Sequence, residues 1–290
     1  MPVGPSLDRM TTRALVLGGG GVAGIAWELG LLSGWAADGV DVAGADLVVG
    51  TSAGSIVGTL LRTGADLQAR YEAQRGPVPA SEPSVPFDGL AMMAAFGEAL
   101  AGVTGQQEAR ARIGRLALRA STVPEGERRA IIESRIGDPE WPAARLVVTA
   151  VDTADGGFLP FDASSDVRLL DAVAASCAVP SVWPPITIGD RRYMDGGMRS
   201  ITNADLVTGC EKVLVVSPTG GFPNSPLGPT LDQEVELLRK DADVHVVLAD
   251  EVALAAFGTN PLDPLTREPS ARAGRDQAVA TVDAVRAFWA

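Results

Sequence analysis

Ser52 is the residue whose setting points most directly to chemistry. It lies between Gly50 and Gly54 in the stretch GTSAG, which fits the pattern G-x-S-x-G. An apolar strand-like run over residues 46–50 leads into the stretch, and helical periodicity over residues 53–63 follows it. In a nucleophile elbow, small residues on both sides of the serine permit a tight turn that exposes its hydroxyl. The alternative is an ordinary helix N-cap, but the strand-to-helix setting favours a nucleophile.

A serine hydroxyl is a weak nucleophile and needs a base. His245 is the one histidine of the chain, and its place after Ser52 fits the order of Ser–Asp–His hydrolases. It stands among valines in the strand-like stretch DVHVVLA, whereas a catalytic histidine normally lies on a loop. The pattern favours a histidine within the sheet, so a carboxylate is the expected base and the triad is the alternative.

Two aspartates, Asp155 and Asp195, each begin an Asp-Gly-Gly triplet. Taken singly, each triplet is a good turn. The first follows a strand-like run and precedes FLPF, so a plain hairpin or loop explains it. The second continues through Gly196 and Gly197 in the stretch RRYMDGGMRSITN, after the segment AASCAVPSVWPP.

The stretch LVLGGGGVAG raises a different chemistry. Gly19, Gly21 and Gly24 have the G-x-G-x-x-G spacing of a dinucleotide-binding loop. Such a loop also requires an acidic residue at the end of the second strand, about 20 residues further on. The run over residues 46–50 ends in Gly50 instead. An NAD(P)-binding oxidoreductase is therefore the weaker alternative.

Four pieces taken together, GGGGVAG, GTSAG, AASCAVPSVWPP and YMDGGMRSITN, resemble the patatin-like phospholipases in order and spacing. The resemblance covers roughly residues 13–250. It implies a three-layer α/β/α fold and a Ser–Asp dyad that works without a catalytic histidine. Ser52 corresponds to the nucleophile and Asp195 to the base of that dyad, which would cleave carboxylic esters of lipids through an acyl-enzyme.

The resemblance also implies that the backbone N–H groups of Gly19, Gly20 and Gly21 form an oxyanion hole. Glycine suits this role because side chains would block the approach of backbone donors to the oxyanion. One departure is Ala23, where the family commonly has Lys or Arg, and it leaves the substrate's head group open. The remaining motif glycines are Gly24, Gly50, Gly54, Gly196 and Gly197.

Short apolar runs alternate with helical stretches along the chain. The runs that predict strands cover residues 13–17, 46–50, 145–151, 212–216 and 243–249. Helical periodicity covers residues 22–36, 53–63, 168–177, 231–241 and 271–289. The strand candidates are rich in Val and Leu without polar alternation, as in parallel strands that are covered on both faces. The pattern predicts an α/β fold with a mostly parallel central sheet.

We expect an N-terminal tail over residues 1–12 and a patatin-like domain over 13–257 that includes a helical insertion at about 76–142. A C-terminal loop and helix, residues 258–290, are expected to pack on the core or on a second subunit. Within the insertion, Met92, Met93 and Phe96 fit a covering helix that packs on the core better than a greasy substrate entrance.

Composition limits the kinds of molecule that the protein is expected to bind. The net charge of −12 argues against nucleic acid and against an anionic membrane, leaving a lipid or other apolar ester and at most transient contact with a membrane surface. The chain has two cysteines and begins without a basic-then-apolar leader, so we expect a cytoplasmic protein. No metal ion and no cofactor are expected, and a catalytically silent lipid-binding scaffold is a further alternative.

Overall fold

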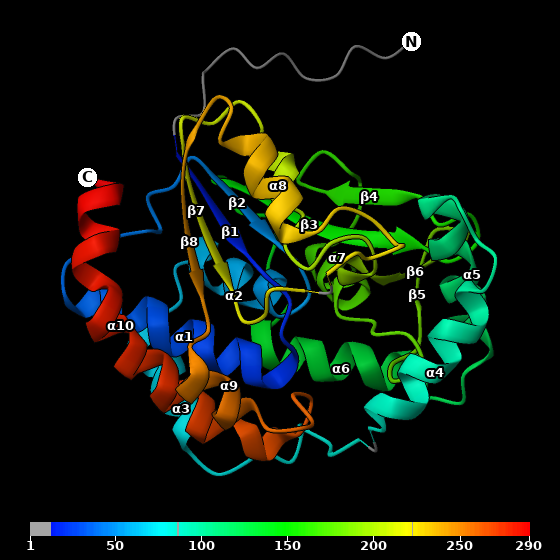
Figure 1. The fold of residues 1–290 in the computed structure, drawn as a ribbon. Helices are drawn as coiled ribbons and strands as arrows, with labels where there is room; N and C mark the ends of the chain where they lie inside the picture. The colour runs from blue at the N-terminus through cyan, green and yellow to red at the C-terminus, as the bar shows by residue number, and fades with distance from the viewer. Residues whose placement is uncertain (1–12, 86, 222) are drawn as a thin grey trace.

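A computed structural model describes residues 13–85, 87–221 and 223–290, so the expected tail over 1–12 lies outside the described residues. Its centre is an eight-stranded sheet in the order β5-β6-β3-β2-β1-β7-β8, with β4 paired to β3 (Figure 1). The strands are β1 Arg13–Leu17, β2 Leu47–Gly50, β3 Arg145–Asp152, β4 Phe158–Phe161, β5 Ile186–Ile188, β6 Arg191–Asp195, β7 Lys212–Ser217 and β8 Asp243–Leu248. Strands β3, β2, β1, β7 and β8 are parallel, whereas β4 and β6 run antiparallel to β3 and β5 runs antiparallel to β6.

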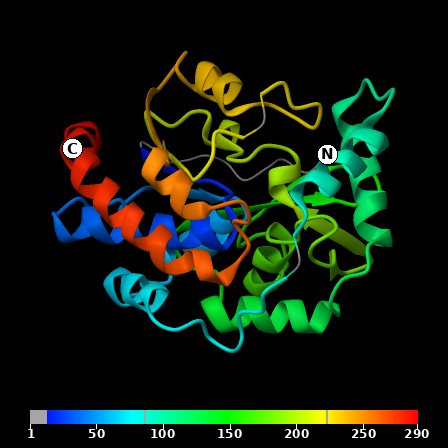
Figure 2. The same ribbon diagram turned by 60° about the horizontal axis from the view of Figure 1, so that its bottom comes forward.

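Helices cover both faces of this sheet. The α-helices are α1 Gly21–Ala37, α2 Ala53–Arg62, α3 Leu67–Arg75, α4 Gly89–Leu100, α5 Gln106–Arg119, α6 Glu125–Ile136, α7 Leu169–Ser176, α8 Leu231–Leu238, α9 Glu251–Phe257 and α10 Arg267–Trp289. Short 3-10 helices are η1 Gly196–Met198, η2 Ala204–Val207 and η3 Pro264–Thr266. Helices α1, α2 and α7 lie on one face, with α10 alongside α1, and α8 with η2 lies on the other (Figures 1 and 2). The predicted α/β fold with a mostly parallel sheet is confirmed.

The side chains of β1 show why the strands lack polar alternation. Leu15 and Leu17 belong to the large core shared with α1, α2, α7 and α10, whereas Ala14 and Val16 belong to the core shared with η2 and α8. All four are fully buried. Because side chains alternate between the faces and both faces are covered, the four positions after Arg13 are all apolar.

The sequence pattern missed several short elements. Strands β5 and β6 form a hairpin around Gly189, which has a φ of +61°, and their outer residues are polar, so no apolar run marks them. Helices α3 and α9, of nine and seven residues, have no counterpart among the predicted helices. Helix α10 begins at Arg267, four residues before the predicted start, because η3 leads directly into it.

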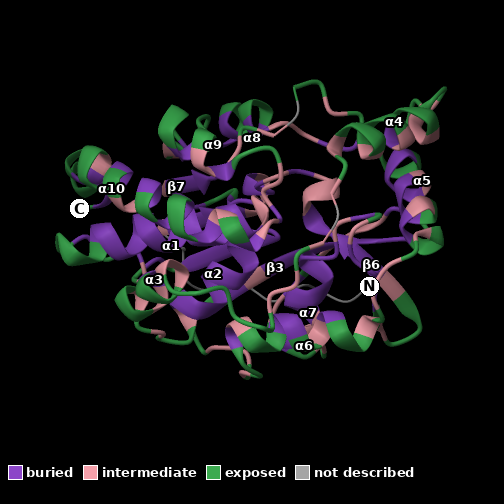
Figure 3. Ribbon diagram, turned by 90° about the horizontal axis from the view of Figure 1, so that it is seen from below, coloured by how far each residue is buried: buried purple, intermediate pink, exposed green. Residues whose placement is uncertain are grey.

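Helices α4, α5 and α6 follow one another between β2 and β3. Helices α4 and α5 pack together beyond the β3–β6 side of the sheet, and Figure 3 shows α4 to be largely exposed or partly buried. Phe96 is buried in a cluster with Val151 of β3 and Met194 of β6, whereas Met93 is 47% exposed. Across the described residues, no helix is long and apolar enough to cross a membrane.

Candidate active site

Ser52 lies in the tight turn between β2 and α2. Its φ of 52° and ψ of −113° are in a region that residues other than glycine rarely adopt, and such strain concentrates at functional sites. The turn is held from outside, because the N–H of Ser52 donates to Ser176 Oγ at 2.9 Å. Ser52 occupies the N-cap position of α2, but its side chain accepts no capping hydrogen bond from the first turn of this fully described helix. The plain N-cap interpretation is therefore not supported.

Gly54 explains how closely the turn approaches the glycine loop. A Cβ at this position would lie 2.1 Å from the carbonyl oxygen of Leu17, so only glycine fits. The N–H of Gly54 donates to the carbonyl of Gly18 at 3.0 Å. The ends of β1 and β2 thus bring the glycine loop and Ser52 side by side, as expected for neighbouring parallel strands.

The glycine loop differs in one respect from the expectation. The N–H of Gly19 donates to the carbonyl of Ile201 at 2.8 Å and is therefore occupied. Within the described part of the chain, the N–H groups of Gly20 and Gly21 make no hydrogen bond, and Gly21 has a φ of +65°. These two amides stand at the start of α1, where the helix dipole favours negative charge. Ala23 is fully buried.

Asp195 is the last residue of β6 and is only 3% exposed. Its Oδ1 accepts a hydrogen bond from the N–H of Gly197 at 2.7 Å, while Oδ2 has no hydrogen-bond partner among the described residues. Burial raises the pKa of Asp195 to about 6, against the opposing effects of Gly197, the Ser52 hydroxyl and the charge of Arg128. The carboxyl is thus a stronger base than an exposed aspartate, whose pKa is about 3.9.

One cavity of about 220 Å³ brings the predicted residues together: it is lined by Ser52, Asp195, Gly19, Gly20 and Gly21. Apolar side chains make up much of the remaining wall, among them Met92, Val179, Met198, Ile201 and Leu262. Met92 thus lines the cavity, in partial agreement with the less favoured interpretation of the insertion, whereas Met93 and Phe96 do not line it. Such a cavity suits an acyl chain with few polar groups at one end.

Two residues that the sequence analysis weighed lie elsewhere. His245 is in edge strand β8, where its ring lies 5.4 Å from that of Phe288, and it does not line the cavity around Ser52. Asp155 is in the β3–β4 turn, where its Oδ1 accepts from Gly157 at 2.7 Å and its Oδ2 pairs with Arg191 at 2.5 Å. The geometry places neither beside Ser52.

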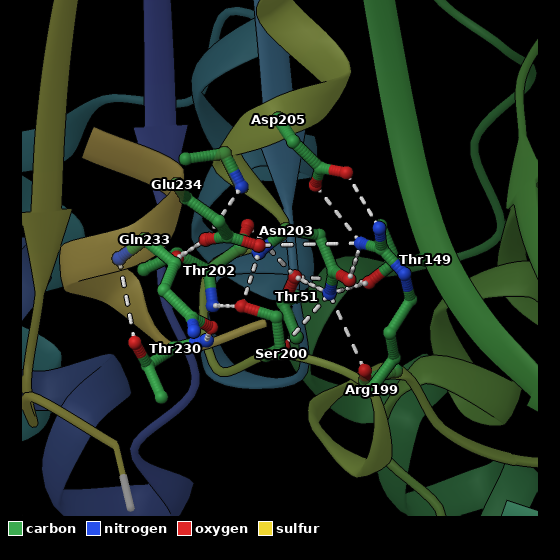
Figure 4. A network of polar contacts seen from close by, with 12 residues as sticks. Thr51, Thr149, Arg199, Ser200, Thr202, Asn203, Asp205, Thr230, Gln233 and Glu234 are labelled. Atoms are coloured by element: carbon green, nitrogen blue, oxygen red, sulfur yellow. Dashed lines mark hydrogen bonds and ion pairs between the residues drawn. The ribbon is translucent and has the colours of Figure 1, made fainter. Parts of the chain in front are cut away.

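Asn203 connects the turn that carries Ser52 with the turn that follows Asp195, and Figure 4 shows its contacts with Thr51 and Ser200. Its side-chain amide donates to Thr51 Oγ1 at 3.1 Å, to the carbonyl of Gly196 at 3.3 Å and to that of Ser200 at 2.8 Å. Thr51 Oγ1 also lies 2.9 Å from Thr149 Oγ1 on β3. The residues that precede Ser52 and follow Asp195 are therefore tied through one fully buried side chain.

Sequence reasoning missed the roles of Ser176 and Asn203. Both stand in stretches that carried the family resemblance, Ser176 in AASCAVPSVWPP and Asn203 in YMDGGMRSITN. Their place within these motifs was the available signal. Their partners could not be read from the sequence, because Ser176 contacts Ser52 and Asn203 contacts Thr51, each more than 100 residues away along the chain.

Comparisons with known proteins give one family and several distant solved structures. The model of the family described as Patatin-like phospholipase matches residues 15–208. Among solved structures, VipD from Legionella pneumophila has a TM-score of 0.46 at 12% identity, and the match covers 95% of this chain and 67% of VipD. The type III effector ExoU of Pseudomonas aeruginosa has a TM-score of 0.40 at 15% identity, covering 96% of this chain and 53% of ExoU. No curated protein matches the sequence.

The chain therefore spans about half the length of ExoU and two thirds of that of VipD. The family match is the finding that identifies the chain, because it covers more than half of the 290 residues and includes the glycine loop, the GTSAG turn and Asp195. The chain belongs to the patatin-like phospholipases, a family of hydrolases that act on lipid esters.

Proposed function

We propose that this chain is a serine acyl hydrolase that cleaves carboxylic esters of lipids with Ser52 as nucleophile and Asp195 as base. One observation carries the proposal: both side chains border the same largely apolar cavity, next to the unoccupied N–H groups of Gly20 and Gly21. The Ser52 hydroxyl is close enough to Asp195 to lower the pKa of its carboxyl.

The first half of the reaction forms an acyl-enzyme. Ser52 Oγ attacks the ester carbonyl carbon while the carboxylate of Asp195 takes the hydroxyl proton. The carbonyl π electrons move to oxygen, and the resulting oxyanion receives hydrogen bonds from the amides of Gly20 and Gly21, each worth about 3–4 kcal/mol in other enzymes. The bond to the alkoxy oxygen then breaks, and Asp195 returns the proton to the departing alcohol.

The second half releases the acid. The oxygen of a water molecule attacks the acyl carbon while Asp195 accepts a proton from that water. The amides of Gly20 and Gly21 donate hydrogen bonds to the second oxyanion. The bond between the acyl carbon and Ser52 Oγ breaks, and the proton returns to Oγ. Each step conserves atoms and charge with these residues and water, so the proposed reaction needs no cofactor.

The test is hydrolysis of p-nitrophenyl esters of increasing chain length. Ser52→Ala and Asp195→Asn should each lower kcat/KM by about 10³-fold or more, because each removes a reacting group. His245→Gln is the matched control and should keep the activity within about 2-fold. Full activity in Ser52→Ala would contradict the proposal, and a loss of about 10³-fold in His245→Gln would instead support the triad.

Two further parts of the proposal concern the extent of the catalytic domain and the location of the protein in the cell. Residues 13–257 would form the catalytic domain, with the helical segment over 76–142 contributing Met92 to its cavity. We also propose a cytoplasmic site of action, supported by Cys177 and Cys210, which are both buried and free. A catalytically silent lipid-binding scaffold and an NAD(P)-dependent enzyme are the outcomes that the ester assay and a calorimetric NAD(P) titration would reveal.

A further inference from the structure

Arg128 of α6 is a buried arginine whose donors are mostly unused. It is only 2% exposed, its Nη2 donates to the carbonyl of Cys177 at 2.9 Å, and its Cζ lies 3.9 Å from the ring centroid of Trp183. Its Nε and Nη1 have no hydrogen-bond partner among the described residues. Because buried charged donors are costly to leave unpaired, a guanidinium in this state indicates room for an acceptor.

The guanidinium borders a second, smaller cavity of about 20 Å³ that adjoins the first. Gly21, Ser52, Val179 and Leu262 line both cavities, so Arg128 stands beside the proposed nucleophile without sharing the main cavity. A space of this size holds about one water-sized oxygen atom. It therefore fits a single oxygen of a larger group whose remainder lies in the main cavity.

Charge favours an anionic oxygen there. Burial lowers the pKa of Arg128 to about 9, which still leaves it protonated at neutral pH. Arg135 lines the same small cavity, and its charge is balanced by Glu82 through contacts of 2.7 and 2.5 Å. The charges of Glu82 and Asp195 act on Arg128, but no carboxylate of the described residues accepts a hydrogen bond from it. The glycine loop over residues 18–24 contains no cationic side chain.

We propose that Arg128 is a specificity-determining residue that binds an anionic oxygen attached to the leaving group of the ester, so that phosphate-bearing esters are preferred over neutral ones. This inference rests on the proposed hydrolysis at Ser52. The acyl chain occupies the cavity of about 220 Å³, and one phosphate oxygen enters the smaller cavity. One of the two free donors, on Nε or Nη1, can reach that oxygen while Nη2 keeps its hydrogen bond to the carbonyl of Cys177, an arrangement of the planar guanidinium that lysine does not reproduce.

The kinetic test compares two substrates with the same short acyl chains, a phosphatidylcholine and a diacylglycerol, at about pH 8, where Asp195 is ionised. Arg128→Met should lower the ratio of kcat/KM for the phospholipid to that for the neutral ester by about 10- to 100-fold, the effect of losing a charged hydrogen bond. Arg128→Lys should lose at least about 5-fold of that ratio. An unchanged ratio in both variants overturns the proposal.

The matched control is Arg110→Met. Arg110 is also buried, but its Nε and Nη1 already donate to the carbonyls of Gly156 and Leu227 at 2.7 and 2.6 Å, and it lines neither cavity. Its substrate ratio should stay within about 2-fold of the wild type. Because the readout is a ratio, a smaller folded fraction in any variant cancels, and Arg128→Lys decides the question if Arg128→Met does not fold.

A binding experiment separates this inference from the proposed function. Calorimetry on the Ser52→Ala protein uses hexyl phosphate and, in a second arm, inorganic phosphate. Hexyl phosphate should bind and should lose at least about 10-fold in affinity when Arg128→Lys is added, even if the wild type hydrolyses neither substrate. Equal affinity for inorganic phosphate would show a free-anion site and overturn the role in substrate choice, and unchanged binding of hexyl phosphate would overturn the site itself.

Discussion

Asp195 can accept a proton from Ser52 only while its carboxyl is ionised, so its pKa should be visible in the rate. Burial raises that pKa to about 6. A base with a raised pKa gains its active form as the pH increases, so kcat/KM should rise through about pH 6 and level off above about pH 7. The measurement is kcat/KM for a p-nitrophenyl ester between about pH 4.5 and 8.

His245 provides the control for this profile, because histidine ordinarily titrates near 6.5 and could produce a similar curve. Its pKa is lowered by burial in β8. The midpoint should therefore persist in His245→Gln and move upward in Arg128→Met, since the charge of Arg128 helps to keep Asp195 ionised. Loss of the titration in His245→Gln would assign the curve to the histidine and contradict the dyad.

At the scale of elements, hydrogen bonds from Asn203, just before η2, connect the turn around Ser52 with the turn after Asp195. Asn203 is fully buried in a left-handed conformation with a φ of 50°, and its amide holds Thr51 and Gly196 (Figure 4). Asn203→Gly removes the side chain without straining the backbone, because glycine adopts the left-handed conformation readily. The unfolding free energy should fall by about 2–3 kcal/mol, because buried polar groups lose their partner. The kcat should fall about 10- to 100-fold with little change in KM, because the proposed dyad is less well aligned.

Asn224 offers the same substitution without the same contacts. It also has a positive φ, 57°, but it is exposed. Asn224→Gly should leave stability within about 0.5 kcal/mol and kcat within about 2-fold. Thermal unfolding and steady-state kinetics on both variants check the prediction, and wild-type kcat in folded Asn203→Gly would show that the connection does not position the dyad.

The sequence could predict the strands that contain runs of Val and Leu. Strands β1, β2, β3 and β7 are largely buried and edge strand β8 is partly buried, and each contains such a run. Strand β5 has only three residues and β6 begins with two arginines, so neither shows one. Ser52 and Asp195 were found through motifs, since each follows or ends a strand. What could not be predicted depends on partners distant in the chain, such as the carbonyl of Ile201 that occupies the N–H of Gly19.

At the scale of the whole molecule, the last helix, α10, packs against the first, α1. Helix α10 runs alongside α1, and α1 is the helix whose first turn carries the amides of Gly20 and Gly21 (Figure 2). The family match ends at residue 208, so β7, β8 and α10 lie beyond it. The central position of β1 in the sheet nevertheless depends on pairing with β7. We therefore expect the described chain to unfold as one cooperative unit.

Gln277 is the side chain that tests this expectation, because it joins α10 to two other parts of the fold. Its Oε1 accepts from Trp27 Nε1 at 2.9 Å, and its Nε2 donates to the carbonyl of Leu248 at 2.6 Å. Gln277→Leu keeps a similar volume but leaves a buried indole N–H and the carbonyl of Leu248 without their partners, so the unfolding free energy should fall by about 2–4 kcal/mol. Thermal unfolding followed by tryptophan fluorescence and by residual esterase activity measures it.

Both probes should shift together in Gln277→Leu, by several degrees, because the α1–α10 contact and the site at the strand ends belong to one unit. Asp283→Ala on the same helix is the control: its side chain is 91% exposed, so the transition should move by less than the equivalent of about 0.5 kcal/mol. If fluorescence shifts while activity is lost at the wild-type temperature, α10 unfolds separately from the sheet. The amides proposed for the oxyanion hole, those of Gly20 and Gly21, would then be held by β1 and the turn around Ser52 rather than by the helix that carries them.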